Sequence, residues 1–170
     1  MTNIIDLDTY DVDPDALSVA NAMQGVLDRV VSIYASYGVP LPERQFWTMG
    51  TPAVDCAQLV VSFIQLYLGP PGDEASRPQR CTQPRTMVLN VTVSRAIPVV
   101  GQQGRAPSAA KIQDGSVISA VDAWVLMSSI NLLDQGEEGG FGVGVIATLN
   151  APEPQGGYQT VNMQVTMAVP

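Results

Sequence analysis

Apolar residues recur at every third or fourth position between residues 16 and 34, with polar residues between them. This spacing places the apolar side chains on one side of a helix, so the pattern predicts an amphipathic helix of about 24 residues. Asp13 and Pro14 are residue types preferred at a helix N-cap and first turn. Gly38, with Pro40 two residues later, predicts a left-handed C-cap that ends the helix.

The later part of the chain contains the patterns of β-strands. Residues 57–68 form an apolar run that ends at the sequence GPPG, which predicts a buried strand. Residues 86–94 alternate between apolar and polar positions, which predicts a strand with one buried face. Residues 143–149 and 160–169 are predicted to form a hairpin across NAPEPQGGY. We interpret residues 39–52, which contain several prolines, as a connector.

A second helix is predicted from about Ser108 to Asp134, and the Asp114–Gly115 pair is a candidate break in it. Its part from 116 to 134 is apolar on most of its circumference. A helix of this kind is buried on two sides. We therefore expect one side to face the sheet and the other to face a helix or a neighbouring subunit.

Together these patterns predict an α+β fold, in which a mostly antiparallel sheet of about four strands carries two helices packed on one face. The chain of 170 residues is long enough to bury one core. We expect residues 13–170 to form a single domain and residues 1–12 to form an acidic N-terminal arm. No internal repeat or low-complexity tract is present.

Charged residues are few and unevenly distributed. They make up 14% of the chain against 46% hydrophobic residues, and the net charge is −8. So few ionic groups are unusual for a lone soluble monomer, and we expect part of the surface to be covered in an oligomer. One lysine, Lys111, and seven arginines do not form the basic cluster that binds a DNA backbone tightly. Acidic residues crowd the first stretch at Asp6, Asp8, Asp11, Asp13 and Asp15.

Cys56 stands beside Asp55 just before an apolar run, where a nucleophile, a metal ligand or a core residue would each fit. A catalytic thiol needs a base, most often a histidine, and the chain contains no histidine. A structural zinc site needs about four Cys or His ligands, and the cysteines are Cys56 and Cys81 alone. We expect Cys56 to be a small core residue, with a disulfide to Cys81 in a mature extracellular particle as the alternative. The sequence predicts no catalytic, metal-binding or cofactor-binding residue, and no enzyme activity.

The charge clusters have more than one interpretation. The N-terminal aspartates lack the glycine and terminal Glu of a calcium loop, so we interpret them as a solvated arm rather than a cation site. Glu137 and Glu138 have no partner nearby in the sequence, and no phosphate-binding glycine motif is present. Arg77, Arg80 and Arg85 either orient docking between subunits or are ordinary surface arginines of a loop.

Targeting signals are not apparent in the sequence. No positively charged start precedes an apolar run, so we expect no signal peptide. No apolar stretch approaches the roughly 20 residues that span a bilayer. We therefore expect the protein to be made and folded in the cytosol, without a membrane partner.

Three segments, FWTMGTPAVDCAQLVV, CTQPRTMVLNVTVSRAIPV and GVIATLNAPEPQGGYQTVNMQVTMAVP, resemble tail terminators, which belong to the head-to-tail connector proteins of long-tailed phages (siphoviruses) that infect actinobacteria. The resemblance covers roughly residues 45–170 and implies a small α+β fold. It also implies a homo-oligomeric ring, commonly a hexamer, that caps the head-proximal end of the tail tube and stops its polymerisation.

The partners implied by this resemblance are further copies of the chain, the major tail tube protein and the head-side connector or stopper protein. DNA would pass through the lumen without specific binding, and the protein would reside in the tail or neck of the virion after assembly in the host cytoplasm. The resemblance implies no catalytic residues. Helix 116–134 and the sheet edges are the expected sources of the ring interface, and the loops 97–110 and 134–142 would face the channel or the adjoining ring.

Four other functions remain open at this point. The chain could be another head-to-tail connector, either an adaptor or a stopper, or it could be a tail-tube protein, although two substantial helices argue against the β-rich tube fold. It could also be a phage module that binds a host protein. A small enzyme that uses carboxylates is the remaining alternative, and it would need a metal or a defined pocket.

Overall fold

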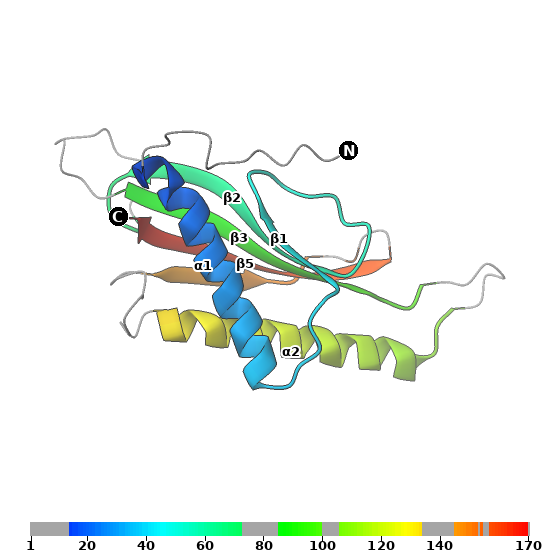
Figure 1. Ribbon diagram of the computed structural model, residues 1–170. Helices are drawn as coiled ribbons and strands as arrows, with labels where there is room; N and C mark the ends of the chain where they lie inside the picture. Colours follow the sequence, from blue (N-terminus) through cyan, green and yellow to red (C-terminus); the bar gives the residue numbers. More distant parts are fainter. Residues whose placement is uncertain are drawn as a thin grey trace.

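In the residues that it describes, the computed structural model contains two helices and five strands (Figure 1). In chain order these are α1 (Pro14–Ser36), β1 (Arg44–Thr48), β2 (Gln58–Leu68), β3 (Arg85–Ala96), α2 (Ala109–Leu133), β4 (Ile146–Asn150) and β5 (Tyr158–Val169). The described residues are 14–72, 85–99, 106–133, 145–152, 154 and 157–169. The predicted α+β class is confirmed, and the sheet has five strands rather than four.

The strands form one mostly antiparallel sheet in the order β1-β2-β3-β5-β4, in which the β1–β2 pair alone is parallel. β3 and β5 pair along their whole length, from Arg85 opposite Val169 to Ala96 opposite Tyr158. β4 and β5 form the predicted antiparallel hairpin. β5 therefore lies inside the sheet, between β3 and β4.

The two faces of the sheet differ because side chains alternate along each strand. One face is apolar and carries both helices, since residues of α1, α2 and this face share one buried core. Figure 1 shows α1 crossing the sheet obliquely and α2 running alongside β4 and β5. The opposite face carries mostly uncharged polar side chains, among them Asn90, Thr92, Asn162, Gln164 and Thr166.

α1 forms as the sequence predicts, and its C-terminal end has the expected cap. Gly38 has a φ of 63°, a left-handed conformation that glycine adopts without steric cost. The Gly38 amide donates to the Ala35 carbonyl, and the Val39 amide donates to the Tyr34 carbonyl, both at 3.1 Å. These bonds satisfy two carbonyls of the last turn and direct the chain back toward the sheet. The predicted N-cap, Asp13, lies outside the described residues.

β1 corrects the prediction that residues 39–52 are only a connector. Residues 44–48 pair in parallel with the first part of β2, from Arg44 opposite Gln58 to Thr48 opposite Ser62. The sequence RQFWT does not alternate and is flanked by proline and glycine, so its own pattern gives no strand signal. These residues are extended because they pair with β2, and the order of apolar and polar residues within the segment does not reveal that pairing.

α2 also corrects a prediction, because it runs through Asp114–Gly115 without a break. Gly115 in a helix interior costs about 1 kcal/mol relative to alanine. The residues on both sides are helical, and the later part of the helix packs on the core through Val125, Leu126 and Ile130. That packing outweighs a local cost of this size.

β2 is longer than its neighbour at the edge of the sheet. β1 pairs only with residues 58–62, and a register shift between Phe63 and Gln65 places a bulge at Ile64. Beyond the bulge, β2 continues to Leu68 with β3 on one side and no described strand on the other. This part of β2 is an exposed sheet edge without a charged residue.

Candidate functional site

A buried polar network fixes α2 on the rest of the fold. The Asp122 carboxylate on α2 is fully buried and accepts the Tyr34 hydroxyl of α1 at 2.8 Å. It also accepts two hydrogen bonds from the Arg95 guanidinium of β3, at 2.9 Å from Nε and 2.8 Å from the terminal nitrogen. The same Arg95 nitrogen donates to the Pro40 carbonyl at 2.7 Å. Tyr34, Arg95 and Asp122 thus meet at one carboxylate, and Arg95 links the segment at Pro40 to them.

The electrostatics of this network favour a structural role. Burial, and then the neighbouring Asp122 carboxylate, raise the pKa of the Tyr34 hydroxyl well above its ordinary value of 10.0. Hydrogen bonding to Asp122 raises the pKa of Arg95 as well, against the opposing effect of burial. Tyr34 thus stays neutral, Arg95 stays charged, and both donate hydrogen bonds to Asp122. Such a buried network holds the elements together.

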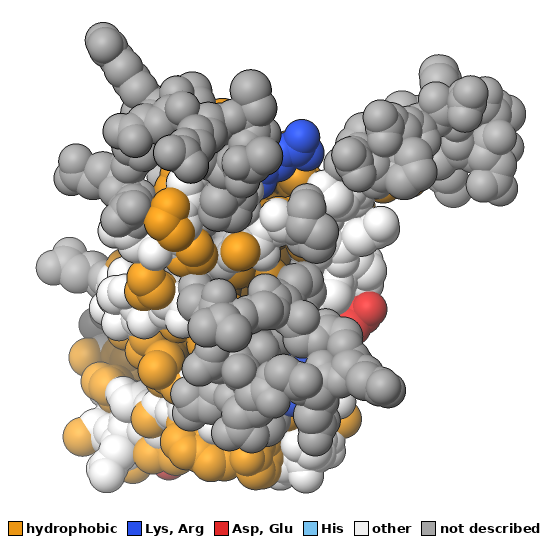
Figure 2. Space-filling model, turned by 90° about the vertical axis from the view of Figure 1, so that its left-hand side faces the viewer, with side chains coloured by type: hydrophobic (Ala, Val, Ile, Leu, Met, Phe, Trp, Pro, Cys, Tyr) orange, Lys and Arg blue, Asp and Glu red, His pale blue; other side chains and the backbone are white. Residues whose placement is uncertain are grey.

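The side of α2 that points away from the sheet is apolar and exposed. Val117, Ala120, Trp124 and Met127 follow one another at spacings of three and four residues, so they lie on one side of the helix. Val117 is 55% exposed, Trp124 53% and Met127 38%. We call these four residues the outer α2 face. Figure 2 shows hydrophobic side chains gathered over the lower part of the molecule, where α2 lies.

The outer α2 face is extended by residues of neighbouring elements. Tyr37, just after α1, contacts Trp124 edge to face, with ring centroids 4.4 Å apart, and is itself 49% exposed. Ile118 on the adjoining side of α2 is 48% exposed. Between residues 115 and 133 the one charged residue is Asp122, which is buried and paired. A contiguous apolar surface without charge, rimmed by polar residues, is typical of a protein interaction site.

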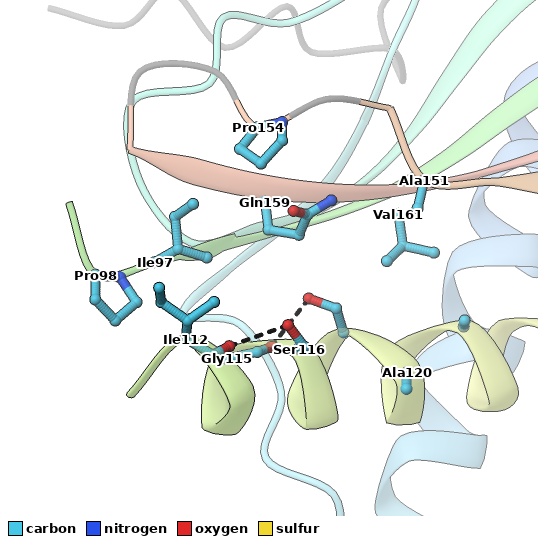
Figure 3. Close-up of a pocket in the computed structure, with 12 residues that line it drawn as sticks. Ile97, Pro98, Ile112, Gly115, Ser116, Ala120, Ala151, Pro154, Gln159 and Val161 are labelled. Carbon is cyan, nitrogen blue, oxygen red and sulfur yellow. Dashed lines mark hydrogen bonds between the residues drawn. The ribbon is translucent and has the colours of Figure 1, made fainter. Parts of the chain in front are cut away.

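Two hollows lie beside the N-terminal half of α2. A cavity of about 400 Å³ lies between α2, the end of β3 and the β4–β5 connection (Figure 3). It is lined mainly by Ile97, Ile112, Ala123, Pro154 and Val161. Its polar groups are Gln159 and the hydroxyls of two serines, Ser116 and Ser119, which both donate to helix carbonyls. The cavity therefore suits an apolar side chain better than a charged ligand.

The second hollow, of about 370 Å³, lies on the opposite side of the same half of α2, against Val39, Pro40 and Arg95. Gly115 lines both hollows, because it has no side chain to fill either of them. The first half of α2 is consequently held less tightly than the second half, which carries Asp122 and the core residues. It presents apolar side chains around much of its circumference.

A smaller apolar surface is uncovered at the other end of the sheet. Trp47 of β1 lies opposite Val61, and Leu66 of β2 lies opposite Met87, so both belong to the helix-bearing face. Trp47, Leu66 and Leu68 are 37%, 43% and 39% exposed. We call these three residues the uncovered sheet patch. Trp47 is oriented by a 2.9 Å hydrogen bond from its indole nitrogen to Gln24 of α1.

Cys56 is not the core residue that the sequence predicts. It is half-buried in a bend two residues before β2, where its thiol accepts a 3.3 Å contact from Arg44. Arg44 also pairs with exposed Asp55 at 2.8 Å. The expectation failed because the apolar run and the strand begin after Cys56, so the thiol precedes the sheet. Cys81, and with it the alternative disulfide, lies outside the described residues.

Most of the charge clusters noted in the sequence also lie outside the described residues: Asp6, Asp8, Asp11, Asp13, Arg77, Arg80, Glu137 and Glu138, with loop 134–142 and residues 100–105 of loop 97–110. Asp15 belongs to the first turn of α1, and Arg85 is exposed at the start of β3. Within the described ranges no three His, Cys, Asp or Glu residues come together in an arrangement that could hold a metal ion.

The Arg95–Asp122 pair is the feature that sequence reasoning missed. Asp122 interrupts an otherwise apolar helical stretch, and Arg95 ends an apolar strand. A charge at a core-facing position needs a partner of opposite sign. Each of the two residues therefore indicates that a partner exists, but neither identifies it. The partners are 27 residues apart, and nothing local joins them.

Comparisons with known proteins did not identify a family. No protein-family model matches the chain, and no curated protein matches it either. Among the helices that the structure describes, none has the length and apolar character needed to cross a membrane.

Proposed function

We propose that this chain is a virion structural protein, a tail-terminator-like subunit that forms a ring at the head-proximal end of a siphovirus tail tube. In this function the ring ends tube polymerisation and joins the tail to the head-side connector. The proposal combines the sequence resemblance over residues 45–170 with the surface properties of the fold. It assigns the protein a role that depends on shape and self-association, without catalysis.

The observation that carries the proposal is the outer α2 face. Val117, Trp124 and Met127 are each 38–55% exposed on a helix whose second half packs on the core. Monomeric proteins rarely expose a contiguous apolar surface of this kind. Association with further copies of the chain removes this surface from water. The low content of charged residues in the whole sequence also favours self-association.

The polar face of the sheet supports passage of DNA through such a ring. Most of its strand positions carry hydroxyl or amide groups, with apolar exceptions such as Val60 and Val88, and Arg44 is the one basic residue among the described residues that pair across this face. Retention of DNA requires several Lys or Arg contacts to phosphates. A net charge of −8 on each subunit opposes such retention.

Electron microscopy of phage particles assembled without this protein tests the proposal. Loss of a tail terminator predicts unattached or over-long tails beside DNA-filled heads. Tails of normal length that lack heads would assign the chain to another head-to-tail connector instead. Unaltered infectious virions would refute a structural role, and binding of the monomer to a host protein would then favour the host-acting alternative.

A further inference from the structure

The two apolar surfaces of this fold lie at opposite ends of the sheet. α2 packs alongside β4 and β5, whereas the uncovered sheet patch belongs to β1 and β2. Because the strand order is β1-β2-β3-β5-β4, these two pairs of strands form the two opposite edges of the sheet. A closed ring needs such an arrangement, in which each subunit presents two different surfaces that fit each other.

We propose that the outer α2 face of one subunit packs on the uncovered sheet patch of the next subunit in the ring. This inference rests on the proposed ring and names the surfaces that close it. The outer α2 face is a helix surface that lacks a sheet, and the patch is a sheet surface that lacks a helix. A helix on the apolar face of a sheet is a stable layer arrangement, so each surface supplies what the other lacks.

The exposed areas are sufficient for a stable contact. A fully exposed aromatic side chain presents about 150–250 Å². On that scale Val117, Trp124 and Met127, with Tyr37 and Ile118, present roughly 500 Å², and the sheet patch roughly 250 Å². A standard interface buries about 1,600 Å² in total, of which rather more than half is apolar. The two surfaces therefore supply most of the apolar part of one such interface.

Length and charge are also compatible. From Val117 to Met127 the outer α2 face extends about 15 Å at 1.5 Å per helical residue. Trp47 lies opposite Val61 of β2, and from Val61 to Leu66 the patch extends a similar distance at about 3.3 Å per strand residue. Asp122 is the one charged residue between Val117 and Met127, and it is buried and paired with Arg95. Residues 45–48 and 64–68 carry no charge, so contact buries no unpaired charge.

A two-fold contact between the outer α2 faces of two subunits is the competing arrangement, since spacings of three and four also suit helix–helix packing. That arrangement would leave Trp47, Leu66 and Leu68 exposed and would close a dimer rather than a ring. The contact between α2 and the sheet patch covers both surfaces and propagates from one subunit to the next. For these two reasons the structure favours it.

Disulfide cross-linking between single-cysteine variants tests the contact. In a background with Cys56→Ser and Cys81→Ser, one chain carries Val117→Cys and a second carries Leu66→Cys. Oxidation of the mixture is expected to give a product of about 36 kDa, twice the 18.0 kDa chain, at least tenfold more abundant than with either variant alone. A chain with both substitutions is expected to give a ladder of products. Ser32→Cys, on the exposed polar side of α1, replaces Val117→Cys as the matched control and should give no product.

The same variants are placed in phage particles by complementation, so that the test includes the assembled state. Efficient self-linking of the Val117→Cys chain would replace the proposed contact by the two-fold one. Absence of the mixed product, both in solution and in particles that contain the protein, would refute the contact and leave the ring itself standing. Particles that assemble normally without the protein would refute the proposed function, whatever the cross-linking in solution shows.

Discussion

Replacement of Asp122 by asparagine should destabilise the fold strongly without changing its shape. Asparagine has the same size, but its amide nitrogen would face donors from Tyr34 and Arg95, which now point at a carboxylate. Arg95 is 17% exposed and Asp122 1%, so water does not replace the lost acceptor. Removing one partner of a buried ion pair costs about 3–5 kcal/mol. A loss of 3 kcal/mol corresponds to a fall in Tm of roughly 10 °C for a domain of this size.

The measurement is denaturant unfolding at one fixed protein concentration, because self-association also changes apparent stability. Asp28→Asn is the matched control. Asp28 accepts a hydrogen bond from Gln24 on the exposed side of α1, and its loss should cost less than about 0.5 kcal/mol. A change of less than about 1 kcal/mol for Asp122→Asn, close to that of Asp28→Asn, would refute the assignment of this network as the anchor of α2.

A triple replacement separates the loss of pairing from the loss of the residues themselves. Asp122→Leu, Arg95→Met and Tyr34→Phe together remove every side-chain member of the network and leave no buried charge. Apolar replacements of buried ion pairs are often neutral or stabilising. The triple variant should therefore recover to within about 2 kcal/mol of the original protein. Stability as low as that of Asp122→Asn would mean that packing at this position, rather than pairing, limits the fold.

Three further predictions follow from single residues. Tyrosine in the unfolded chain ionises near pH 10, whereas folded Tyr34 keeps its proton because its pKa is raised. The contribution of Tyr34 to the unfolding free energy is therefore complete below pH 10 and is lost as the pH rises above it. Between pH 10 and 12 the unfolding free energy of the original protein should fall faster than that of Tyr34→Phe, by up to about 1.4 kcal/mol per pH unit, and parallel slopes would contradict this. Gly115→Ala should stabilise the protein by about 0.5–1 kcal/mol, because alanine favours the helix and its Cβ would lie 3.8 Å from the nearest atom of Pro98, without a clash. Gly38→Ala should instead destabilise the protein by about 1 kcal/mol, because Gly38 has a φ of 63°, which a residue with a Cβ adopts only with strain. Chemical denaturation that ranks the two glycine variants in the opposite order would refute this reasoning. Cys56→Ser should change the unfolding free energy by less than about 0.5 kcal/mol, and a loss above 2 kcal/mol would restore the core assignment.

The long elements of this fold are predictable from the sequence because their apolar spacing is strong and local. α1, its cap at Gly38, β2, β3 and the β4–β5 hairpin all follow from period and turn residues. β1 is not predictable in this way, because its five residues become a strand by pairing with β2. The break expected at Gly115 depended on a local propensity of about 1 kcal/mol, which the packing of α2 overrides.

The candidate site is predictable only in part. The apolar character of residues 116–134 indicates a helix with more than one buried side, and the exposed side is the outer α2 face. Which side faces the sheet depends on Asp122, since its pairing with Arg95 fixes the rotation of the helix. That pairing links elements far apart in sequence, and the periodicity of either element alone does not contain it.

The interior position of β5 determines when this polypeptide can complete its fold during synthesis. β3 ends at Ala96 and its neighbour β5 begins at Tyr158, so about 60 residues separate two strands that pair along their whole length. At 5–20 residues per second the ribosome needs several seconds to supply the missing strand. During that interval the nascent chain exposes the edge of β3 and the core side chains that β5 will cover, which makes it a client for chaperones. Fragments that end before Tyr158 should accumulate as aggregates rather than as folded intermediates.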